Sequence, residues 1–349
     1  MVVGSRCLTV LTVAAATLVA ACADPAPRVT AVPRVDLVWP APPEIPRIRF
    51  LRTLSDPEDI GIKDGFFGGL AAFFKGAPEK RTTAPFGIHK TNAGRLYVVD
   101  TVQQAVQVFD QRKSEHYWFP SDPIDGFDNP IGVVADEKGR VYVSDSRSNL
   151  IHVFDKHGKR YIKAIGRGAV ARPTGLAINQ ATGELLVADT LASQIVAFET
   201  KDFTVTRFVG RDGTGREAFH YPTNIAVSPD GLIYVTDSMN FRIQVLTHDL
   251  KFLRSFGEVG DGPGQFSRPK GVAVDSEGHV YVVDALFDNV QIFDRQGRLL
   301  LAFGSPGSEP GKFWLPNEIF IDAQDRIYVS DAYNQRIQVF QYLKQGGGQ

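Results

Sequence analysis

The chain has 349 residues, of which 43% are hydrophobic and 22% are charged, proportions typical of a globular protein with a large core. Its 38 Lys and Arg residues nearly balance 39 Asp and Glu residues, so the composition lacks the basic excess of a protein that holds nucleic-acid phosphates. Both cysteines, Cys7 and Cys22, lie near the N-terminus, which excludes a disulfide framework or thiolate metal cluster in the rest of the chain.

Residues 1–21 have the organisation of a bacterial export signal. One cation, Arg6, precedes an apolar run from Cys7 to Ala21 that is too short to cross a bilayer. The run ends in Leu18-Val-Ala-Ala-Cys22, which resembles a lipobox. The resemblance implies that Cys22 is lipidated, and that the protein is exported and anchored to the cell envelope, at the outer membrane or the periplasmic face. Cleavage at an ordinary signal-peptidase site, giving a soluble periplasmic protein, is the alternative.

Residues 22–46 are predicted to form an extended tether between this anchor and the folded domain. They contain seven prolines: Pro25, Pro27, Pro33, Pro40, Pro42, Pro43 and Pro46. This density favours polyproline II, and at about 3.1 Å per residue the segment reaches on the order of 75 Å.

Residues 48–54 are predicted to be a strand, and residues 55–83 an insertion with a short helix. Within the insertion, five apolar residues recur at helical spacing and would share one helix face: Phe66, Phe67, Leu70, Phe73 and Phe74. Such a face either packs against the flank of the domain or docks a partner or the bilayer.

Six copies of one pattern fill residues 85–342. Each copy has an opening proline, an apolar strand, a polar turn, a second strand ending in Asp, and further strand-length segments. The opening residues are Pro85, Pro130, Pro173, Pro222, Pro269 and Pro316, and the aspartates are Asp100, Asp145, Asp189, Asp237, Asp284 and Asp331. The interval is 15 residues in five copies and 16 in the third. Four short antiparallel strands per repeat of this length are the unit of a β-propeller blade.

The sixth copy lacks a fourth strand, and Ile48–Leu54 resembles the fourth-strand segment Phe252–Phe256 of an earlier copy. We therefore expect Ile48–Leu54 to complete blade six and to close the ring, which removes the open sheet edges. The sequence predicts an all-β, six-bladed propeller of four-stranded antiparallel blades over residues 47–342, followed by a flexible tail at residues 343–349.

Two segments carry a family resemblance. Pro222-Thr-Asn-Ile-Ala-Val with Tyr234-Val-Thr-Asp, and Pro269-Lys-Gly-Val-Ala-Val-Asp with Tyr281-Val-Val-Asp, resemble NHL repeats. The resemblance covers residues 47–342 apart from the insertion and implies the propeller fold. Propellers of this kind include protein- and RNA-binding modules, surface lipoproteins and an amidating lyase, so the resemblance leaves the function open.

The six repeated aspartates are interpreted as structural residues. A side chain present in every blade serves the blade, and we expect each carboxylate to accept backbone N–H groups in the turn after its strand.

A candidate site lies where two blades depart from the other four. The second residue after the opening proline is glycine in four blades but Asn224 and Glu318 in the others, with Asn317 adjacent to Glu318. Propeller enzymes similar to gluconolactonases hold a divalent cation with a Glu and Asn set, so the resemblance implies a metal site at Glu318, Asn224 and Asn317. Oxygen donors of this kind suit Ca²⁺. Alternatively, these side chains only solvate a polar channel mouth.

Histidine ligation of zinc, which the resemblance to the amidating lyase implies, finds less support. Zinc needs three convergent protein ligands, and only His89 and His220 are predicted to lie near the channel.

Two functions of different class follow. The first is a non-enzymatic protein-binding or scaffold module that holds an envelope protein complex, with the membrane contacted through the N-terminal lipid. The alternative is a divalent-metal-dependent hydrolase or lyase, similar to a lactonase, with its site at the channel mouth. No nucleic-acid partner is expected.

Overall fold

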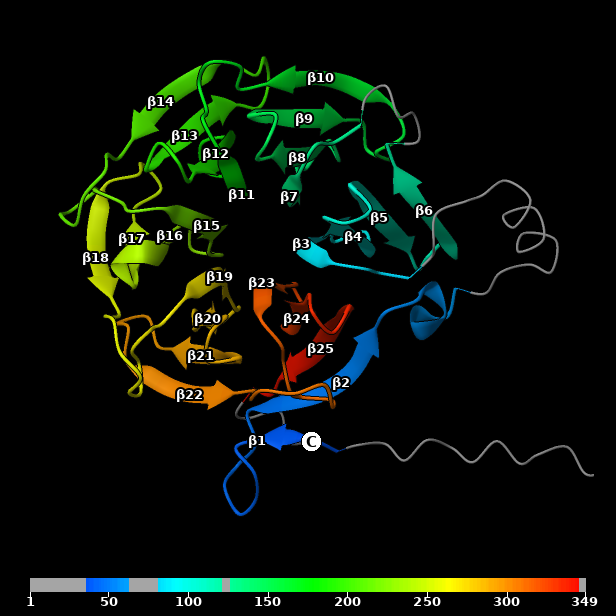
Figure 1. Ribbon diagram of the computed structural model, residues 1–349, viewed down its shortest axis with the longest axis vertical. Helices are drawn as coiled ribbons and strands as arrows, with labels where there is room; N and C mark the ends of the chain where they lie inside the picture. The colour runs from blue at the N-terminus through cyan, green and yellow to red at the C-terminus, as the bar shows by residue number, and fades with distance from the viewer. Residues whose placement is uncertain (1–35, 63–80, 121–125, 345–349) are drawn as a thin grey trace, which may run out of the picture. The chain divides into compact units, whose positions relative to one another are not determined.

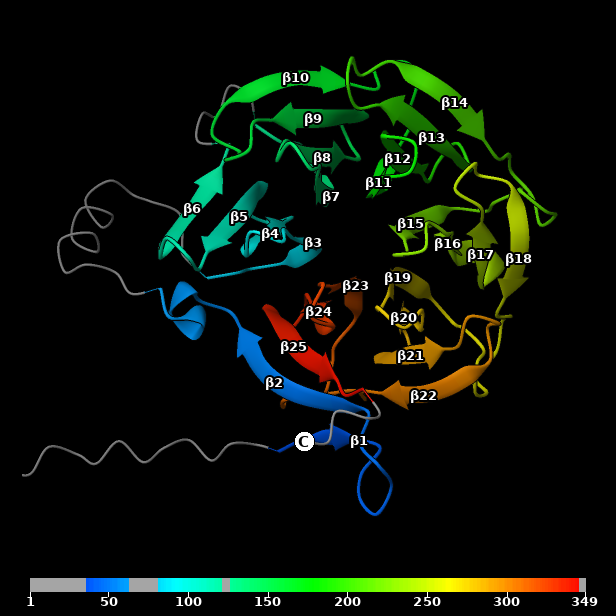
Figure 2. The same ribbon diagram turned by 180° about the vertical axis from the view of Figure 1, so that it is seen from behind.

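The computed structural model describes residues 36–62, 81–120 and 126–344. All of them belong to one compact unit, Val35–Gln349. Six sheets form the blades of a propeller, and the first strand of each blade lies beside the central channel (Figures 1 and 2). The prediction of a six-bladed all-β propeller is confirmed.

The first five blades each contain four antiparallel strands. Their bounds are as follows: blade one, β3 (Pro85–Lys90), β4 (Arg95–Asp100), β5 (Ala105–Asp110) and β6 (Glu115–Phe119); blade two, β7 (Pro130–Ala135), β8 (Val141–Asp145), β9 (Leu150–Phe154) and β10 (Tyr161–Ile165); blade three, β11 (Pro173–Asn179), β12 (Glu184–Asp189), β13 (Gln194–Glu199) and β14 (Val205–Val209). The next two are blade four, β15 (Pro222–Val227), β16 (Ile233–Asp237), β17 (Arg242–Leu246) and β18 (Phe252–Phe256); and blade five, β19 (Pro269–Val274), β20 (Val280–Asp284), β21 (Asn289–Phe293) and β22 (Leu299–Phe303).

Blade six joins the two ends of the propeller. It contains β23 (Pro316–Ile321), β24 (Arg326–Asp331), β25 (Arg336–Tyr342) and β2 (Ile48–Leu54). Strand β2 pairs antiparallel with β25, from Ile48 opposite Tyr342 to Leu54 opposite Ile337, and Figure 1 shows the two side by side. The predicted closure by Ile48–Leu54 is confirmed.

A fifth strand, β1 (Val38–Trp39), extends blade six into the range expected to be a tether. Trp39 packs against Phe303 and Phe340, with ring centroids 5.7 and 5.8 Å apart. Burial of this large aromatic surface outweighs the preference of the proline-rich segment for an extended, solvated chain. The domain therefore begins before residue 47. At the other end, Leu343 donates its N–H to Arg47 O, so bonding also continues past residue 342.

The insertion is described only in part. A 3₁₀ helix, η1 (Pro57–Ile60), is capped by Asp56, whose side chain accepts the N–H of Glu58. The five apolar residues predicted to share a helix face, Phe66, Phe67, Leu70, Phe73 and Phe74, lie outside the described residues, as does Cys22. A second 3₁₀ helix is η3 (Ser238–Asn240). Within the described ranges, no helix is long and apolar enough to cross a bilayer.

The core lies between neighbouring blades. Because the strands are apolar on both faces, each sheet packs against the sheets on either side. Between blades five and six, for example, Tyr281 and Val290 cluster with Ile319 and Val329, and all four are buried. The same arrangement between other pairs makes each blade depend on its neighbours.

The repeated aspartates all have the same place in the strand register. In every blade the aspartate lies opposite the opening proline, as Asp145 lies opposite Pro130. Proline has no N–H to donate to the strand ladder at that point. The Asp145 carboxylate is fully buried and accepts N–H groups from both the preceding segment and the following turn. It thereby ties the entry of the blade to the hairpin between its second and third strands.

Candidate functional site

The channel lies inside a ring formed by the second residue after each opening proline. Four of these are glycines, and the neighbouring inner strands approach too closely for a side chain there. A Cβ on Gly175 would lie 2.6 Å from Asn224 Cα, and a Cβ on Gly271 would lie 2.7 Å from Ile319 N. The ring can therefore hold larger side chains only at the remaining two positions.

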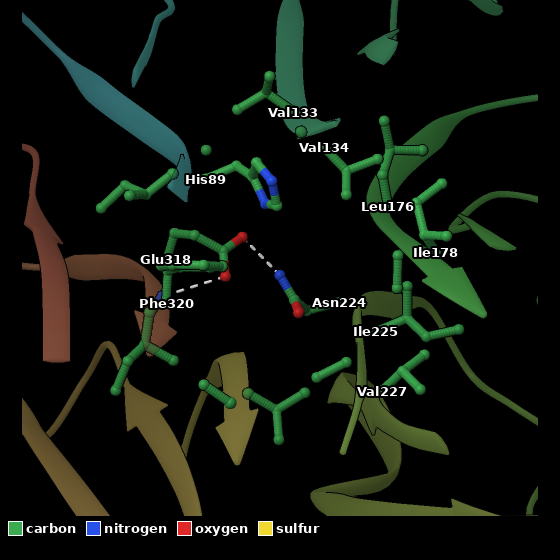
Figure 3. A pocket seen from close by; sticks show the side chains of 18 of the residues that line it. His89, Val133, Val134, Leu176, Ile178, Asn224, Ile225, Val227, Glu318 and Phe320 are labelled. Atoms are coloured by element: carbon green, nitrogen blue, oxygen red, sulfur yellow. Dashed lines mark hydrogen bonds between the residues drawn. The ribbon is translucent and has the colours of Figure 1, made fainter. Parts of the chain in front are cut away.

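Those two positions meet across the channel. Asn224 extends from β15 and Glu318 from β23, and the inner strand of blade five lies between them. The Asn224 amide Nδ2 donates to Glu318 Oε2 at 2.5 Å, as Figure 3 shows. The sequence prediction placed both residues at this mouth, and the structure brings them into direct contact.

Glu318 lacks an ion-pair partner in the part of the chain that the structure describes. Its Oε1 accepts the N–H of Ile319 at 3.0 Å. Burial raises the pKa of the Glu318 carboxyl to about 8, against the opposing effect of the hydrogen bonds from Ile319 and Asn224. The carboxyl therefore carries a proton at neutral pH unless a cation takes the place of that proton.

Asn317 does not join the pair. Its Nδ2 donates to Leu315 O at 3.3 Å, although the residue lines the same cavity as Glu318. Among the described residues, no group of three or more His, Cys, Asp or Glu side chains is placed to hold a metal. Glu318 and Asn224 supply two adjacent side chains where Ca²⁺ takes six to eight oxygens. A calcium site here stays a prediction, and it would need water or ligand oxygens.

Three cavities follow the inner strands from start to end. The first, about 340 Å³, is lined by residues beside the opening prolines, and the second, about 260 Å³, by the middle of the strands. Asn224 and Glu318 line both, so the hydrogen-bonded pair marks the boundary between them. The third, about 450 Å³, lies at the strand ends and has Asp230, Asp322 and Asp325 in its lining.

The two histidines expected near the channel are in different settings. His89 extends into the second cavity (Figure 3), where its ring packs edge-on against Phe320 with centroids 5.1 Å apart. Burial lowers the pKa of His89 to about 4, so the ring is neutral at physiological pH. His220 is instead bonded through Nδ1 to Asp212, 2.8 Å away, in an exposed pair between blades. These two residues do not form a shared zinc site.

Sequence reasoning missed a group of cations at the first cavity. Arg172, Arg268 and Lys270 line it. Each residue is next to an opening proline, so comparing the blades at those two positions would have singled out the cations, but only the folded ring shows that they converge on one cavity.

It also missed a ring of exposed apolar side chains, which lie two residues after the repeated aspartates. Five blades contribute one each, with exposed fractions between 51% for Met239 and 64% for Val102; the other three are Leu191, Leu286 and Tyr333. Blade two has Arg147 at this position. Trp314, itself 54% exposed, packs against Tyr333 with ring centroids 5.6 Å apart. We call the five residues Val102, Leu191, Met239, Leu286 and Tyr333 the apolar ring.

The repeat pattern matches a known family. Residues 127–154 and 313–340 match the NHL repeat family, and the six sheets supply the expected architecture. The chain is an NHL-repeat β-propeller. Residues 213–318 of this NHL-repeat propeller also match the SMP-30/gluconolactonase/LRE-like region, and that range includes both Asn224 and Glu318. No curated protein matches the chain in sequence.

Solved structures of similar fold have varied functions. A protein of unknown function from Bacteroides thetaiotaomicron is 17% identical, with a TM-score of 0.61 over 84% of this chain and 75% of that one. A gluconolactonase from Xanthomonas campestris is 17% identical, with a TM-score of 0.57 over 75% and 87%. Virginiamycin B lyase from Staphylococcus aureus is 15% identical, with a TM-score of 0.55 over 75% and 96%. At these identities the likeness of the NHL-repeat propeller to each structure concerns the fold alone.

Proposed function

We propose that this NHL-repeat propeller is a non-enzymatic protein-binding module, and that the apolar ring is its binding surface. The observation that supports the proposal is the repeated exposure of one large apolar side chain per blade in five of six blades. Single exposed apolar residues are common, but a set gathered around one rim is typical of an interaction surface.

The position of these residues favours a single continuous surface. Each occupies the turn between the second and third strands of its blade, at the end of the propeller where the inner strands begin. Met239 lines the first cavity, and Leu191 lines a neighbouring depression of about 510 Å³ together with Arg147 and Arg172. A partner seated over this end would thus cover apolar side chains at the rim and cations nearer the axis.

The partner that fits is a protein with apolar side chains around acidic ones. Full burial of one such side chain contributes about 1.5–3 kcal/mol, and the unpaired cations favour negative charge at the centre. If Cys22 is lipidated as predicted, the partner belongs to an envelope protein complex, and the membrane contact comes through the lipid.

Site-specific photo-crosslinking in cells tests the surface. A photoreactive amino acid is placed at Leu191 or Met239, and at Ala323, which lines the cavity at the opposite end of the channel, as the matched control. We expect the first two positions to capture one partner, identified by mass spectrometry, that position 323 does not capture. The purified partner should then bind Leu191→Asp and Met239→Asp variants at least tenfold more weakly than Ala323→Asp. Capture from all three positions alike, or unchanged affinity, contradicts the proposal.

The alternative is a divalent-metal-dependent hydrolase or lyase, similar to a lactonase. The observation in its favour is that the gluconolactonase-type match spans Asn224 and Glu318, which the fold brings into contact. Glu318 and Asn224 would hold the ion through their side-chain oxygens, and a bound cation would supply a Lewis acid that polarises a carbonyl oxygen. Because Glu318 has a raised pKa of about 8, the ion would have to displace a proton.

Metal analysis with calcium titration separates the two functions. The enzyme alternative predicts a stoichiometric ion that is lost in Glu318→Ala and retained in Glu137→Ala, which changes an exposed carboxylate elsewhere. It also predicts an affinity that rises about tenfold per pH unit up to pH 8. A wild-type chain that neither contains nor binds a divalent ion would remove this alternative.

A further inference from the structure

The first cavity contains positive charge that the protein does not neutralise. Arg172, Arg268 and Lys270 converge on it from blades three and five. None of the three side chains forms an ion pair or a hydrogen bond within the residues that the structure describes. Several other cations of the described residues are paired at close range, as Arg336 is with Asp331 at 2.7 Å. The cavity differs from those sites because its cations have no carboxylate partner.

The three cations are close enough to affect one another. Burial, together with the smaller effects of the Arg268 and Arg172 charges, lowers the pKa of Lys270 to about 8. Like charges held together without a counter-ion destabilise the folded state. A bound anion would relieve that repulsion.

Three hydroxyl groups of the wall already donate hydrogen bonds within the protein. Thr190 Oγ1 donates to Pro222 O at 2.7 Å, Ser238 Oγ donates to Pro269 O at 2.7 Å, and Thr223 Oγ1 donates to Lys270 O at 3.3 Å. These bonds connect one blade to the inner strand of the next. The hydroxyls thus hold the blades together, and the cations are the charged groups available to recognise a ligand.

We propose that the first cavity is a binding site for an organic anion with a carboxylate head group. The planar guanidinium groups of Arg172 and Arg268 suit the planar, bidentate geometry of a carboxylate, and Lys270 adds a point charge to the same cavity. Phe86, Ile131 and Met239 supply apolar wall for the body of the ligand. The volume of about 340 Å³ lies within the range of small-molecule sites. The site goes beyond the proposed protein-binding function, because a free carboxylate needs no protein partner.

Calorimetric titration of the purified full-length chain tests the site. The probes are benzoate, succinate and inorganic phosphate, each at low salt and at 0.15 M NaCl. We expect saturable 1:1 binding of a carboxylate that weakens with salt. Arg268→Gln and Lys270→Met should each weaken it about tenfold or more, since charge-assisted hydrogen bonds are lost. Lys251→Met, which removes an exposed cation in the turn before β18, is the matched control and should bind as the wild type does.

Two kinds of result would overturn the assignment of a carboxylate site. Absence of binding by all three probes, or equal affinity in the wild type, Arg268→Gln and Lys270→Met, shows that the cavity is not an anion site. Binding of phosphate without binding of a carboxylate would overturn the assignment of a carboxylate head group. Competition between benzoate and a purified protein partner identifies an acidic side chain of the partner as the source of the carboxylate, and its absence identifies a free small molecule. Failure of the crosslinking experiment would leave these titrations unaffected, so the two proposals fail separately.

Discussion

Replacement of a repeated aspartate should destabilise the propeller strongly, and Asp145→Ala is the clearest case. Its buried carboxylate accepts four backbone N–H groups: from Asp128 at 2.6 Å, Asn129 at 3.1 Å, Arg147 at 3.1 Å and Ser148 at 3.0 Å. A hydrogen bond to a charged group contributes about 1.5–3 kcal/mol, but such bonds are not additive and water enters part of the space. We expect a loss of about 3–5 kcal/mol in the free energy of unfolding, the range for breaking a buried charged network.

Urea unfolding followed by circular dichroism measures this loss as a lower midpoint at an unchanged slope. Asp145→Asn should fall between the wild type and Asp145→Ala, because the amide keeps one acceptor oxygen but turns an NH₂ group toward N–H donors. Asp261→Ala is the control, since Asp261 is exposed in a loop between blades. A loss below about 1 kcal/mol in Asp145→Ala, comparable to that in Asp261→Ala, would refute the structural role of the carboxylate.

Three further predictions concern the channel. Since burial raises the pKa of Glu318 to about 8, the folded state holds more protons than the unfolded state between about pH 4.5 and 8. The free energy of unfolding of the wild type should therefore decrease as the pH rises through that window, by up to about 1.4 kcal/mol per pH unit. Urea titrations of Glu318→Gln should not show this decrease. Burial lowers the pKa of His89 to about 4, so stability should fall as pH drops from about 6.5 to 4; His89→Leu should reduce that acid sensitivity, and a His89 pKa near 6.5 by NMR would contradict it. Gly271→Ala should cost about 1–3 kcal/mol in thermal unfolding, because its Cβ would lie 2.7 Å from a backbone nitrogen, whereas Gly215→Ala, with nothing within 4 Å, should be neutral.

Most of the fold could be predicted because the same sequence pattern occurs six times. The spacing between opening proline and aspartate reflects a register in which the two residues pair, as Pro316 does with Asp331. Six copies of that register fix the blade count, and the missing fourth strand of the last copy predicts the closure by Ile48–Leu54. Strand β1 could not be predicted in this way. It occurs once, in a proline-rich segment, and its formation depends on the contacts of Trp39 with Phe303 and Phe340, which are distant in sequence.

The candidate site was predictable only where one position could be compared across the blades. That comparison selected Asn224 and Glu318, which the fold brings together. It did not predict the side-chain direction of Asn317, because the local bond to Leu315 O decides it. Nor did it find Arg172 and Arg268: cations are ordinary surface residues in sequence, and only the folded ring shows that these converge on one cavity without a counter-charge.

The symmetry of the scaffold explains why function should concentrate at a few positions. Glycine at Gly175 and Gly271 is imposed by backbone atoms of the next blade, so side chains in the ring are possible only where the geometry is relaxed. Asn224 and Glu318 occupy such positions on either side of blade five, and Lys270 is the neighbour of Gly271 in the intervening strand. A ligand at the first cavity would therefore contact blades four, five and six together. Loss of the close packing at Gly271 would disturb the pair and the cation at once, which makes this glycine the point where the stability of the ring and the chemistry of the site are coupled.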